Sequence, residues 1–260
     1  MTKNISVSFI QADVVWEDKV KNLDFFSEKI DKLKINSDLI VLPEMFNSGF
    51  SLSPEKNFEQ ENGETVLWLV HQATQKKVAI AGSLIIKENN NFYNRLVFVY
   101  PNGDIKFYNK RHLFRMAGEH NHYTAGNQKV VVEYLGWKII LLVCYDLRFP
   151  VWSRNIDNQY DMMIYVANWP HSRVSQWETL LAARAIENQA YVLGVNRVGT
   201  DGNGFYYSGF SKIINPKGEY LVTASKDEVI CKTAELDYQK LVKYRQSFPV
   251  SSDADKFLLS

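Results

Sequence analysis

Cysteines, long apolar runs and an excess of charge of either sign are all scarce in this 260-residue sequence. The two cysteines, Cys144 and Cys231, are too few for a disulfide framework and fit a reducing compartment. No apolar run approaches the roughly 18 residues of a membrane-spanning helix, and the N-terminal residues lack the pattern of a signal peptide. We therefore expect a soluble, cytoplasmic protein.

The charges are balanced, with 30 lysines and arginines against 29 aspartates and glutamates, and no long basic block occurs. Nucleic acids and membrane surfaces are therefore disfavoured as partners. Hydrophobic residues make up 46% of the chain, enough for a sizeable core. Without an internal repeat or a linker, the chain is expected to form a single domain over residues 1–260.

Short apolar, β-branched runs bounded by turn residues predict strands, and segments with helical periodicity lie between some of them. The predicted strands lie at 5–12, 38–43, 78–86, 94–100, 104–108, 129–135, 137–143, 161–168 and 191–198. The predicted helices lie at 17–33, 63–77 and 175–190. In the last helix, one face carries Trp177, Leu180, Leu181, Arg184 and Asn188.

The segments "PNGD" at 101–104 and "NPKGE" at 215–219 are hairpin signals. Hairpins join antiparallel strands, whereas strands that alternate with helices are typical of parallel ones. The fold class is therefore α/β, with mixed sheets and layers of helices.

Three reactive side chains follow three predicted strands. Glu44 comes after "DLIVLP", Lys110 after "DIKFYN" and Cys144 after "WKIILLV". Ligands of open α/β sheets bind at the carboxyl ends of the strands, so these positions are candidates for one site. Taken singly, an ordinary surface carboxylate, a solvated lysine and a buried thiol are the simpler interpretations.

Together, the three groups suit amide cleavage by a sulfur nucleophile. Glu44 would accept the thiol proton as Cys144 attacks the carbonyl carbon, and would return it to the departing amine. Lys110 and the backbone N–H of Tyr145 would stabilise the oxyanion. Water would then hydrolyse the thioester, again with Glu44 as base.

These residues and their surroundings resemble the nitrilase or carbon-nitrogen hydrolase superfamily, which has a Glu-Lys-Cys triad. The motifs "DLIVLPEMF", "YNKRHLF" and "LLVCYDLRFP" occur in the family's order, and the likeness continues through "EHNHYTAGN", "YVANWP", "ARAIENQAYVLGVNRVG" and "INPKGE". The resemblance implies a four-layer αββα sandwich that forms a homodimer or a higher homo-oligomer. It also implies that Glu119 is the family's second glutamate, which would hydrogen-bond Lys110 and orient the substrate.

Within the superfamily, Cys144, Tyr145 and Asp146 differ from the Cys-Trp-Glu that is usual in true nitrilases. The segments "CYDLRFPVWSRN", "YVANWP" and "ARAIENQAYV" look most like the ω-amidases. That resemblance implies hydrolysis of the side-chain amide of 2-oxoglutaramate or 2-oxosuccinamate to the dicarboxylate and ammonia, without a cofactor or a metal. An amidase for deaminated glutathione or an N-carbamoyl compound is the alternative.

The free carboxylate of such a substrate requires a cation. Arg173, in the loop "NWPHSRVSQW", is the first candidate and Arg115 the second. Phe46 and Trp169 are candidates for the walls of the pocket, although each also suits an aromatic core. We interpret Arg148, Arg184 and Glu187 as structural residues. Arg184 is expected to be buried and paired with Glu187.

Two interpretations from other classes compete with this one. A papain-like Cys-His pair would need one of five histidines, His71, His112, His120, His122 or His171, but no local signature of those proteases surrounds Cys144. His120 and His122 lack a third ligand at a suitable spacing for a metal. A non-catalytic protein that binds a partner or a small acid would not need the three reactive groups together.

Overall fold

Two mixed six-stranded sheets lie face to face at the centre of the computed structural model, which describes residues 2–33 and 37–255. The first sheet has the order β14-β1-β2-β3-β4-β5, in which β1, β2 and β3 are parallel and the outer pairs are antiparallel. Its strands are β1 (Ile5–Gln11), β2 (Leu39–Val41), β3 (Ala79–Glu88), β4 (Asn91–Val99), β5 (Ile105–Asn109) and β14 (Ile230–Leu236).

The second sheet repeats this pattern in the order β13-β12-β9-β8-β7-β6, with β7, β8 and β9 parallel. Its strands are β6 (Val131–Tyr134), β7 (Trp137–Val143), β8 (Met162–Ala167), β9 (Tyr191–Asn196), β12 (Lys212–Ile214) and β13 (Tyr220–Thr223). A separate two-stranded ladder joins β10 (Val198–Thr200) to β11 (Tyr206–Ser208).

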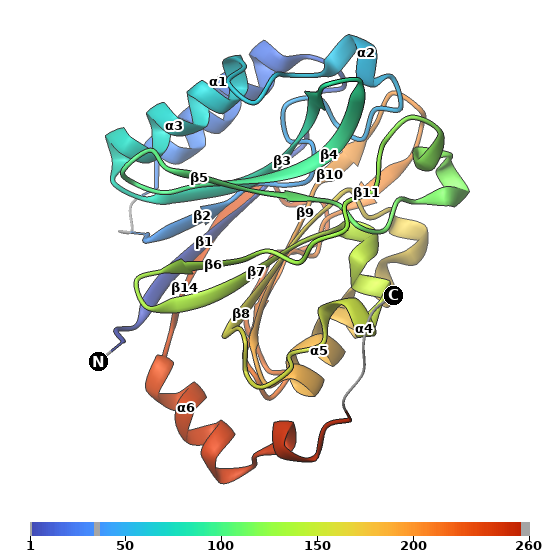
Figure 1. The fold of residues 1–260 in the computed structure, drawn as a ribbon. Coiled ribbons are helices and arrows are strands. Elements are labelled where there is room, and N and C mark those ends of the chain that lie inside the picture. The colour runs from blue at the N-terminus through green and yellow to red at the C-terminus, as the bar shows by residue number, and fades with distance from the viewer. Residues whose placement is uncertain (1, 34–36, 256–260) are drawn as a thin grey trace.

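Helices cover the outer face of each sheet (Figure 1). The first sheet is covered by α1 (Lys19–Asp31) and α3 (Glu64–Lys76), and the second by α5 (Val174–Asn188). The predicted order of four layers, αββα, is therefore confirmed. The remaining helical segments are α2 (Pro54–Asn57), α4 (Pro150–Ser153), α6 (Tyr238–Ser247), η1 (Arg115–Ala117), η2 (Glu119–Asn121), η3 (Cys144–Arg148), η4 (His171–Arg173) and η5 (Val250–Asp253).

Local sequence explains why α1 begins and which face it buries. The side chain of Asp18 accepts a hydrogen bond from the backbone N–H of Lys21 at 3.1 Å and so caps the helix. Leu23, Phe26 and Ile30, spaced by three and four residues, are buried against the first sheet. At the end of α3, Lys77 adopts the left-handed conformation with φ 57°.

Helix α5 follows the prediction for its buried face. Trp177, Leu181, Arg184 and Asn188 are buried, and Leu180 is partly buried. Arg184 lies 2.9 Å from Glu187, as expected, and also donates to the carbonyl oxygen of Leu147 at 2.7 Å. The helix thereby binds the turn that follows β7.

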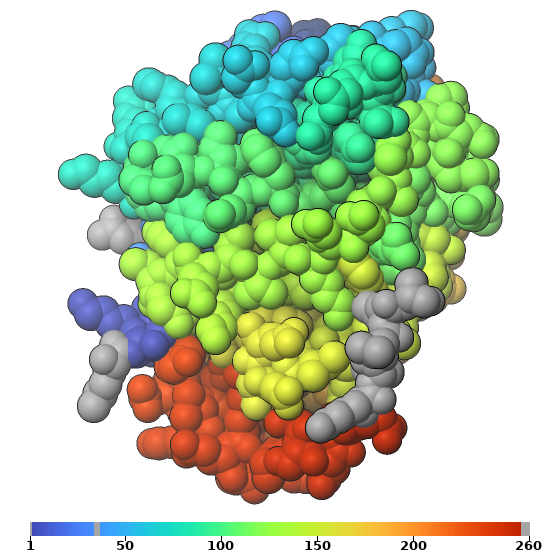
Figure 2. All heavy atoms as spheres, in the orientation of Figure 1, coloured from blue at the N-terminus to red at the C-terminus, as the bar shows by residue number. Residues whose placement is uncertain are grey.

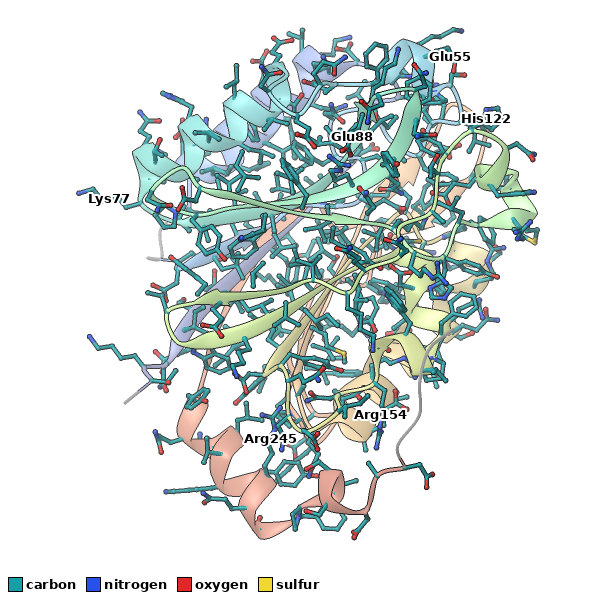
Figure 3. The ribbon with its side chains drawn as sticks, in the orientation of Figure 1. Glu55, Lys77, Glu88, His122, Arg154 and Arg245 are labelled. Carbon is teal, nitrogen blue, oxygen red and sulfur yellow. The ribbon has the colours of Figure 1, made fainter. Side chains whose placement is uncertain are left out.

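The nine predicted strands and three predicted helices are all present, and both hairpin signals join antiparallel strands. The strand predicted at 191–198 divides at Arg197 into β9 and β10. Strands β11, β12, β13 and β14 and helix α6 were not among the predicted elements, although the hairpin signal at 215–219 lies between β12 and β13. In Figure 3, Arg245 of α6 points toward the second sheet, where it lies 2.8 Å from Asp161.

Helices α2 and α3, light blue to cyan, lie at one end of the molecule, whereas α6, in red, lies at the opposite end (Figure 2). Within residues 2–33 and 37–255, no helix has both the length and the apolar character needed to cross a membrane.

Replacing Leu181 by Ala should destabilise the fold because this fully buried side chain packs where Gly194 lets α5 approach β9. The cavity left behind should lower the free energy of unfolding by about 2–5 kcal/mol. Urea unfolding followed by circular dichroism measures this. The matched control is Leu67→Ala at an exposed position of α3, which should change stability by less than about 1 kcal/mol. An equal loss of unfolding free energy in both variants would contradict this packing of α5 on β9.

Candidate active site

The three reactive side chains that follow strands meet between the two sheets. Glu44 lies just beyond β2 and Lys110 directly after β5 in the first sheet, whereas Cys144 directly follows β7 in the second. Nζ of Lys110 lies 2.9 Å from Oε1 of Glu44, and both side chains are almost completely buried. The packing of one sheet on the other therefore creates the cluster.

Glu119 completes the cluster from η2. Nζ of Lys110 donates to both of its carboxylate oxygens, at 3.0 and 2.9 Å. The backbone N–H of Phe114 also donates to Oε2 of Glu119, at 2.6 Å. One ammonium group thus lies between two buried carboxylates, a geometry that charge-assisted hydrogen bonds favour.

The pKa shifts in this cluster follow from burial and charge. Burial acts to lower the pKa of Lys110, but Glu119 and Glu44 outweigh it and raise that pKa well above its ordinary value. Burial raises the pKa of Glu119, which Lys110 partly offsets and Glu44 reinforces. The charged ammonium form of Lys110 is therefore favoured at neutral pH.

Asn94 of β4 is a part of the cluster that the sequence did not single out. Its Nδ2 donates to Oε1 of Glu44 at 2.7 Å and contacts Oε1 of Glu119 at 3.3 Å. Its Oδ1 accepts a hydrogen bond from Ser83 Oγ, which in turn accepts from the backbone N–H of Met45, each at 2.9 Å. The only feature in the sequence that could have indicated Asn94 is its position as a polar residue at the start of the run "NRLVFVY".

Cys144 occupies a sharp turn at the end of β7. Its φ of 43° is uncommon for a residue other than glycine and directs the backbone abruptly into η3. Burial, followed by the negative charge of Glu44, raises the pKa of the thiol well above its ordinary value. This shift favours the neutral thiol, which becomes a good nucleophile only when a base removes its proton.

Asp146, two residues after Cys144, fixes this turn. One carboxylate oxygen accepts from the backbone N–H of Val143 at 2.9 Å and from the hydroxyl of Tyr108 at 2.7 Å. The other accepts from the backbone N–H of His112 at 3.0 Å and lies 2.8 Å from its Nδ1. A single buried carboxylate thereby joins the turn at Cys144 to the segments on either side of Lys110.

No histidine ring hydrogen-bonds the sulfur of Cys144 in the described part of the chain. His112 faces Asp146 instead, and its ring stacks on Phe149 with centroids 3.8 Å apart. The geometry therefore favours a carboxylate over a histidine as the base. The same ranges contain no group of three histidine, cysteine, aspartate or glutamate side chains arranged to hold a metal ion.

A cavity of about 100 Å³ opens beside Cys144 and Lys110. Its walls are mainly aromatic and apolar, with cationic groups among them. Besides those two residues, the lining consists of Phe50, Phe114, Met116, Ala117, Tyr145, Arg148, Asn168, Trp169, Pro170, Arg173, Phe205 and Tyr207. Three candidate residues, Tyr145, Trp169 and Arg173, thus line this cavity.

Two expected pocket residues lie elsewhere. Phe46 is fully buried in the core beneath α1 and α3, with its ring 5.3 Å from that of Phe26. Phe50 lines the cavity in place of Phe46, and the centroid of its ring lies 5.3 Å from Nζ of Lys110. Arg115 is exposed on η1, whose turn directs the neighbouring Phe114 and Met116 to the cavity instead. Both residues are therefore removed from the candidate site.

Arg148, which was read as structural, is a further correction because it lines the cavity. Its guanidinium group lies over the ring of Trp169, 5.0 Å from the centroid, and donates to Gln176. The guanidinium group of Arg173 lies over Phe114 at 5.3 Å. Within the described residues, no carboxylate lies within 4.0 Å of either guanidinium group, so both can meet an anion in the cavity.

Comparison with known proteins places this geometry among related enzymes. Residues 6–246 match the family described as carbon-nitrogen hydrolase. The chain is 48% identical to the omega-amidase YafV of Escherichia coli over 98% of both chains. It is 35% identical to the 2-oxoglutaramate amidase of Bacillus subtilis, over 97% of this chain and 98% of the relative.

Solved structures give the same result for the fold. A CN-hydrolase superfamily protein from Xanthomonas campestris, which carries an arsenic adduct in its active site, is 39% identical, with a TM-score of 0.96 and 99% of each chain covered. A nitrilase superfamily member from Saccharomyces cerevisiae, 24% identical with a TM-score of 0.83 over 95% of each chain, shares the fold.

Replacing Asp146 by Asn should destabilise the turn at Cys144 because an NH₂ group would face N–H or O–H donors. Leaving buried donors without an acceptor should lower the free energy of unfolding by about 1–3 kcal/mol. Chemical denaturation measures the change. Asp157→Asn, at an exposed turn position, is the control and should stay within about 0.5 kcal/mol of the wild type. An unchanged stability for Asp146→Asn would refute the anchoring role.

Proposed function

The chain belongs to the carbon-nitrogen hydrolase family, and from that membership we propose that it hydrolyses the distal amide of a small ω-amido 2-oxo acid. The substrates would be 2-oxoglutaramate and 2-oxosuccinamate, and the products the dicarboxylate and ammonia. The names of two relatives, an omega-amidase and a 2-oxoglutaramate amidase, support this substrate class.

One observation carries the proposal: the thiol of Cys144 lies at a small cavity, beside a buried cluster of one ammonium and two carboxylate groups. Such a cluster supplies a base, a fixed positive charge and a nucleophile in a place from which water is largely excluded. In that environment electrostatic interactions are stronger than in water.

In the first half of the reaction, Glu44 takes the proton of the Cys144 thiol as sulfur attacks the amide carbon. The carbonyl π electrons move to oxygen, and the ammonium of Lys110 with the backbone N–H of Tyr145 stabilises this oxyanion. When the oxyanion collapses, the carbon-nitrogen bond breaks, and Glu44 returns the proton to nitrogen, so that ammonia leaves. A thioester on Cys144 remains.

In the second half, a water molecule replaces ammonia. Glu44 takes one of its protons as the oxygen attacks the thioester carbon, and the same positive groups hold the second oxyanion. Collapse breaks the carbon-sulfur bond and returns a proton to sulfur. Glu119 holds Lys110 in place through both halves, because its two oxygens lie 3.0 and 2.9 Å from the ammonium.

The far end of the substrate carries a carboxylate and a keto group. Arg173 is proposed to bind that carboxylate, since this residue lines the cavity and no carboxylate of the described chain lies within 4.0 Å of its guanidinium group. Arg148 lines the same cavity and is the comparison residue. The volume of about 100 Å³ suits a small acid better than a deaminated tripeptide.

We propose that residues 1–260 act as one catalytic domain, that the protein works in the cytoplasm, and that it forms a homodimer or a larger homo-oligomer. Size-exclusion chromatography with light scattering measures the last of these directly.

Ammonia release from 2-oxoglutaramate is the first test. The wild type should release ammonia rapidly and act slowly on glutamine, because glutamine carries an ammonium group where the substrate has a ketone. Cys144→Ala should abolish the release because it removes the nucleophile. Wild-type release no faster than that of Cys144→Ala would reject the ω-amidase proposal, and deaminated glutathione and an N-carbamoyl amino acid would be assayed next.

Replacing Arg173 by Ala should raise the KM for 2-oxoglutaramate by about 10- to 100-fold, because a charge-assisted hydrogen bond contributes about 1.5–3 kcal/mol. The kcat should change by less than about 3-fold. Steady-state kinetics with Arg148→Ala and with butyramide, a neutral amide, provide the controls. An unchanged KM for Arg173→Ala together with a raised KM for Arg148→Ala would transfer the role to Arg148.

A further inference from the structure

Asn168 is a residue to which the mechanism above gives no role, although it touches both the base and the nucleophile. It directly follows β8 and is 6% exposed. Its backbone N–H donates to Oε2 of Glu44 at 2.7 Å, and its Nδ2 donates to the backbone oxygen of Glu44, also at 2.7 Å. Its own backbone oxygen lies 3.9 Å from the sulfur of Cys144 and accepts from the thiol.

The orientation of the Asn168 side chain follows from these partners. Nδ2 contacts two atoms that can only accept, the backbone oxygen of Glu44 and, at 3.4 Å, its Oε2. An amide rotated by 180° would place an oxygen against both acceptors, so the assignment is fixed by chemistry. Oδ1 is buried and has no hydrogen-bond partner among the described residues. Stability alone does not favour such an unpaired acceptor.

The two carboxylate oxygens of Glu44 have different partners. Oε1 accepts from Lys110 at 2.9 Å and from Asn94 at 2.7 Å, which occupies its lone pairs. Oε2 accepts one short hydrogen bond, from the backbone of Asn168, and one long contact from its side chain. Of the two oxygens, Oε2 therefore has the better-available lone pair for a proton.

Position in the fold strengthens this distinction. Glu44 belongs to the first sheet, whereas Asn168 and Cys144 both follow strands of the second. The backbone after Asn168 is itself held, since Asn196 accepts from the N–H of Trp169 at 2.8 Å and donates to its oxygen at 3.0 Å. Asn168 is thus a rigid link that fixes the carboxylate of one sheet relative to the thiol of the other.

We propose that Asn168 is a positioning residue that aims Oε2 of Glu44 at the thiol of Cys144. This inference rests on the proposed amidase function for the chemistry that follows. Oε2 accepts the thiol proton as the sulfur-carbon bond forms, while Oε1 stays on Lys110 and Asn94. The proton later leaves Oε2 for the departing nitrogen, so the same oxygen serves as base and then as acid.

Two substitutions test this role. Asn168→Ala removes both side-chain contacts to Glu44 without adding a charge. Asn168→Asp keeps the size of the side chain but replaces the donor by an oxygen that repels Glu44. Asn155→Ala is the matched control: Asn155 is 4% exposed and its Nδ2 donates to the backbone oxygens of Tyr160 and Asn188, remote from the candidate site. Circular dichroism confirms that each variant is folded.

The first measurement needs no substrate. Iodoacetamide alkylation of both cysteines is followed by peptide mass spectrometry, so that Cys231 serves as an internal reference. A misaimed base should slow alkylation of Cys144 by about 10-fold or more in both Asn168 variants, since proton removal accompanies attack. Alkylation of Cys231, and of both cysteines in Asn155→Ala, should keep the wild-type rate.

The second measurement is steady-state kinetics with 2-oxoglutaramate. Misplacement of the base should lower kcat by about 100-fold in both Asn168 variants and leave KM within about 3-fold. A role limited to filling space would instead leave Asn168→Asp active, because Asp has nearly the same shape. Unchanged alkylation of Cys144 in both variants would overturn the proposal.

The two measurements also separate this inference from the proposed function. If the wild type released no ammonia from 2-oxoglutaramate but alkylation of Cys144 still depended on Asn168, the substrate class would be wrong and the positioning role would stand. If ammonia release were fast in the wild type and in both Asn168 variants, the amidase function would stand and the positioning role would fall.

Discussion

The burial of one ammonium group between two carboxylates is the constraint on which the site depends. Lys110 reaches Glu44 and Glu119 at hydrogen-bond distance, with all three side chains removed from water. Desolvating these charges is costly, and removing one partner of such a buried pair costs about 3–5 kcal/mol. The arrangement holds because each group has several partners, including Asn94 for both carboxylates and the backbone of Phe114 for Glu119.

The same constraint explains why the chain is built from two similar sheets. Each sheet contains three parallel strands flanked by antiparallel ones. The carboxyl ends of the parallel strands therefore lie at one edge of each sheet. The first sheet supplies the charged groups, whereas the second supplies the thiol. Asp146 follows a strand of the second sheet and accepts hydrogen bonds from Tyr108 of the first sheet and from the backbone N–H of His112. This fully buried carboxylate thereby joins the two sheets next to the site.

The protonation state of Cys144, the proposed nucleophile, is a consequence of this burial. The thiol of Cys144 has a raised pKa, so the neutral form is favoured until a substrate carbonyl is in place. A neutral thiol is less open to chance alkylation or oxidation than a thiolate. The base must then be accurately placed, which gives the links between Glu44 and the second sheet their importance. The aromatic walls of the cavity add to the effect, because they keep the local dielectric low.

Local sequence was sufficient to predict most of the secondary structure around the core. It was also sufficient to single out the candidate residues with reactive side chains. Periodicity identified nine strands because each is short, apolar and bounded by turn residues, but it missed β12 and β14, and motif order identified Glu44, Lys110, Cys144 and Glu119 as candidates. The predictions failed where side-chain direction matters. Phe46 and Phe50, four residues apart, are alike in sequence, yet one packs under α1 and α3 and the other lines the cavity.

Only the tertiary structure decided which polar groups meet. Arg115 is exposed while Arg148 reaches the cavity, and Asn94 and Asn168 join the charged cluster although neither was a candidate site residue, even with Asn168 inside the motif "YVANWP". The physical reason is that periodicity records which residues avoid water, whereas a hydrogen bond depends on distances across two sheets. The sequence by itself determined the elements and the reactive residue types, and the packing of the sheets determined their geometry.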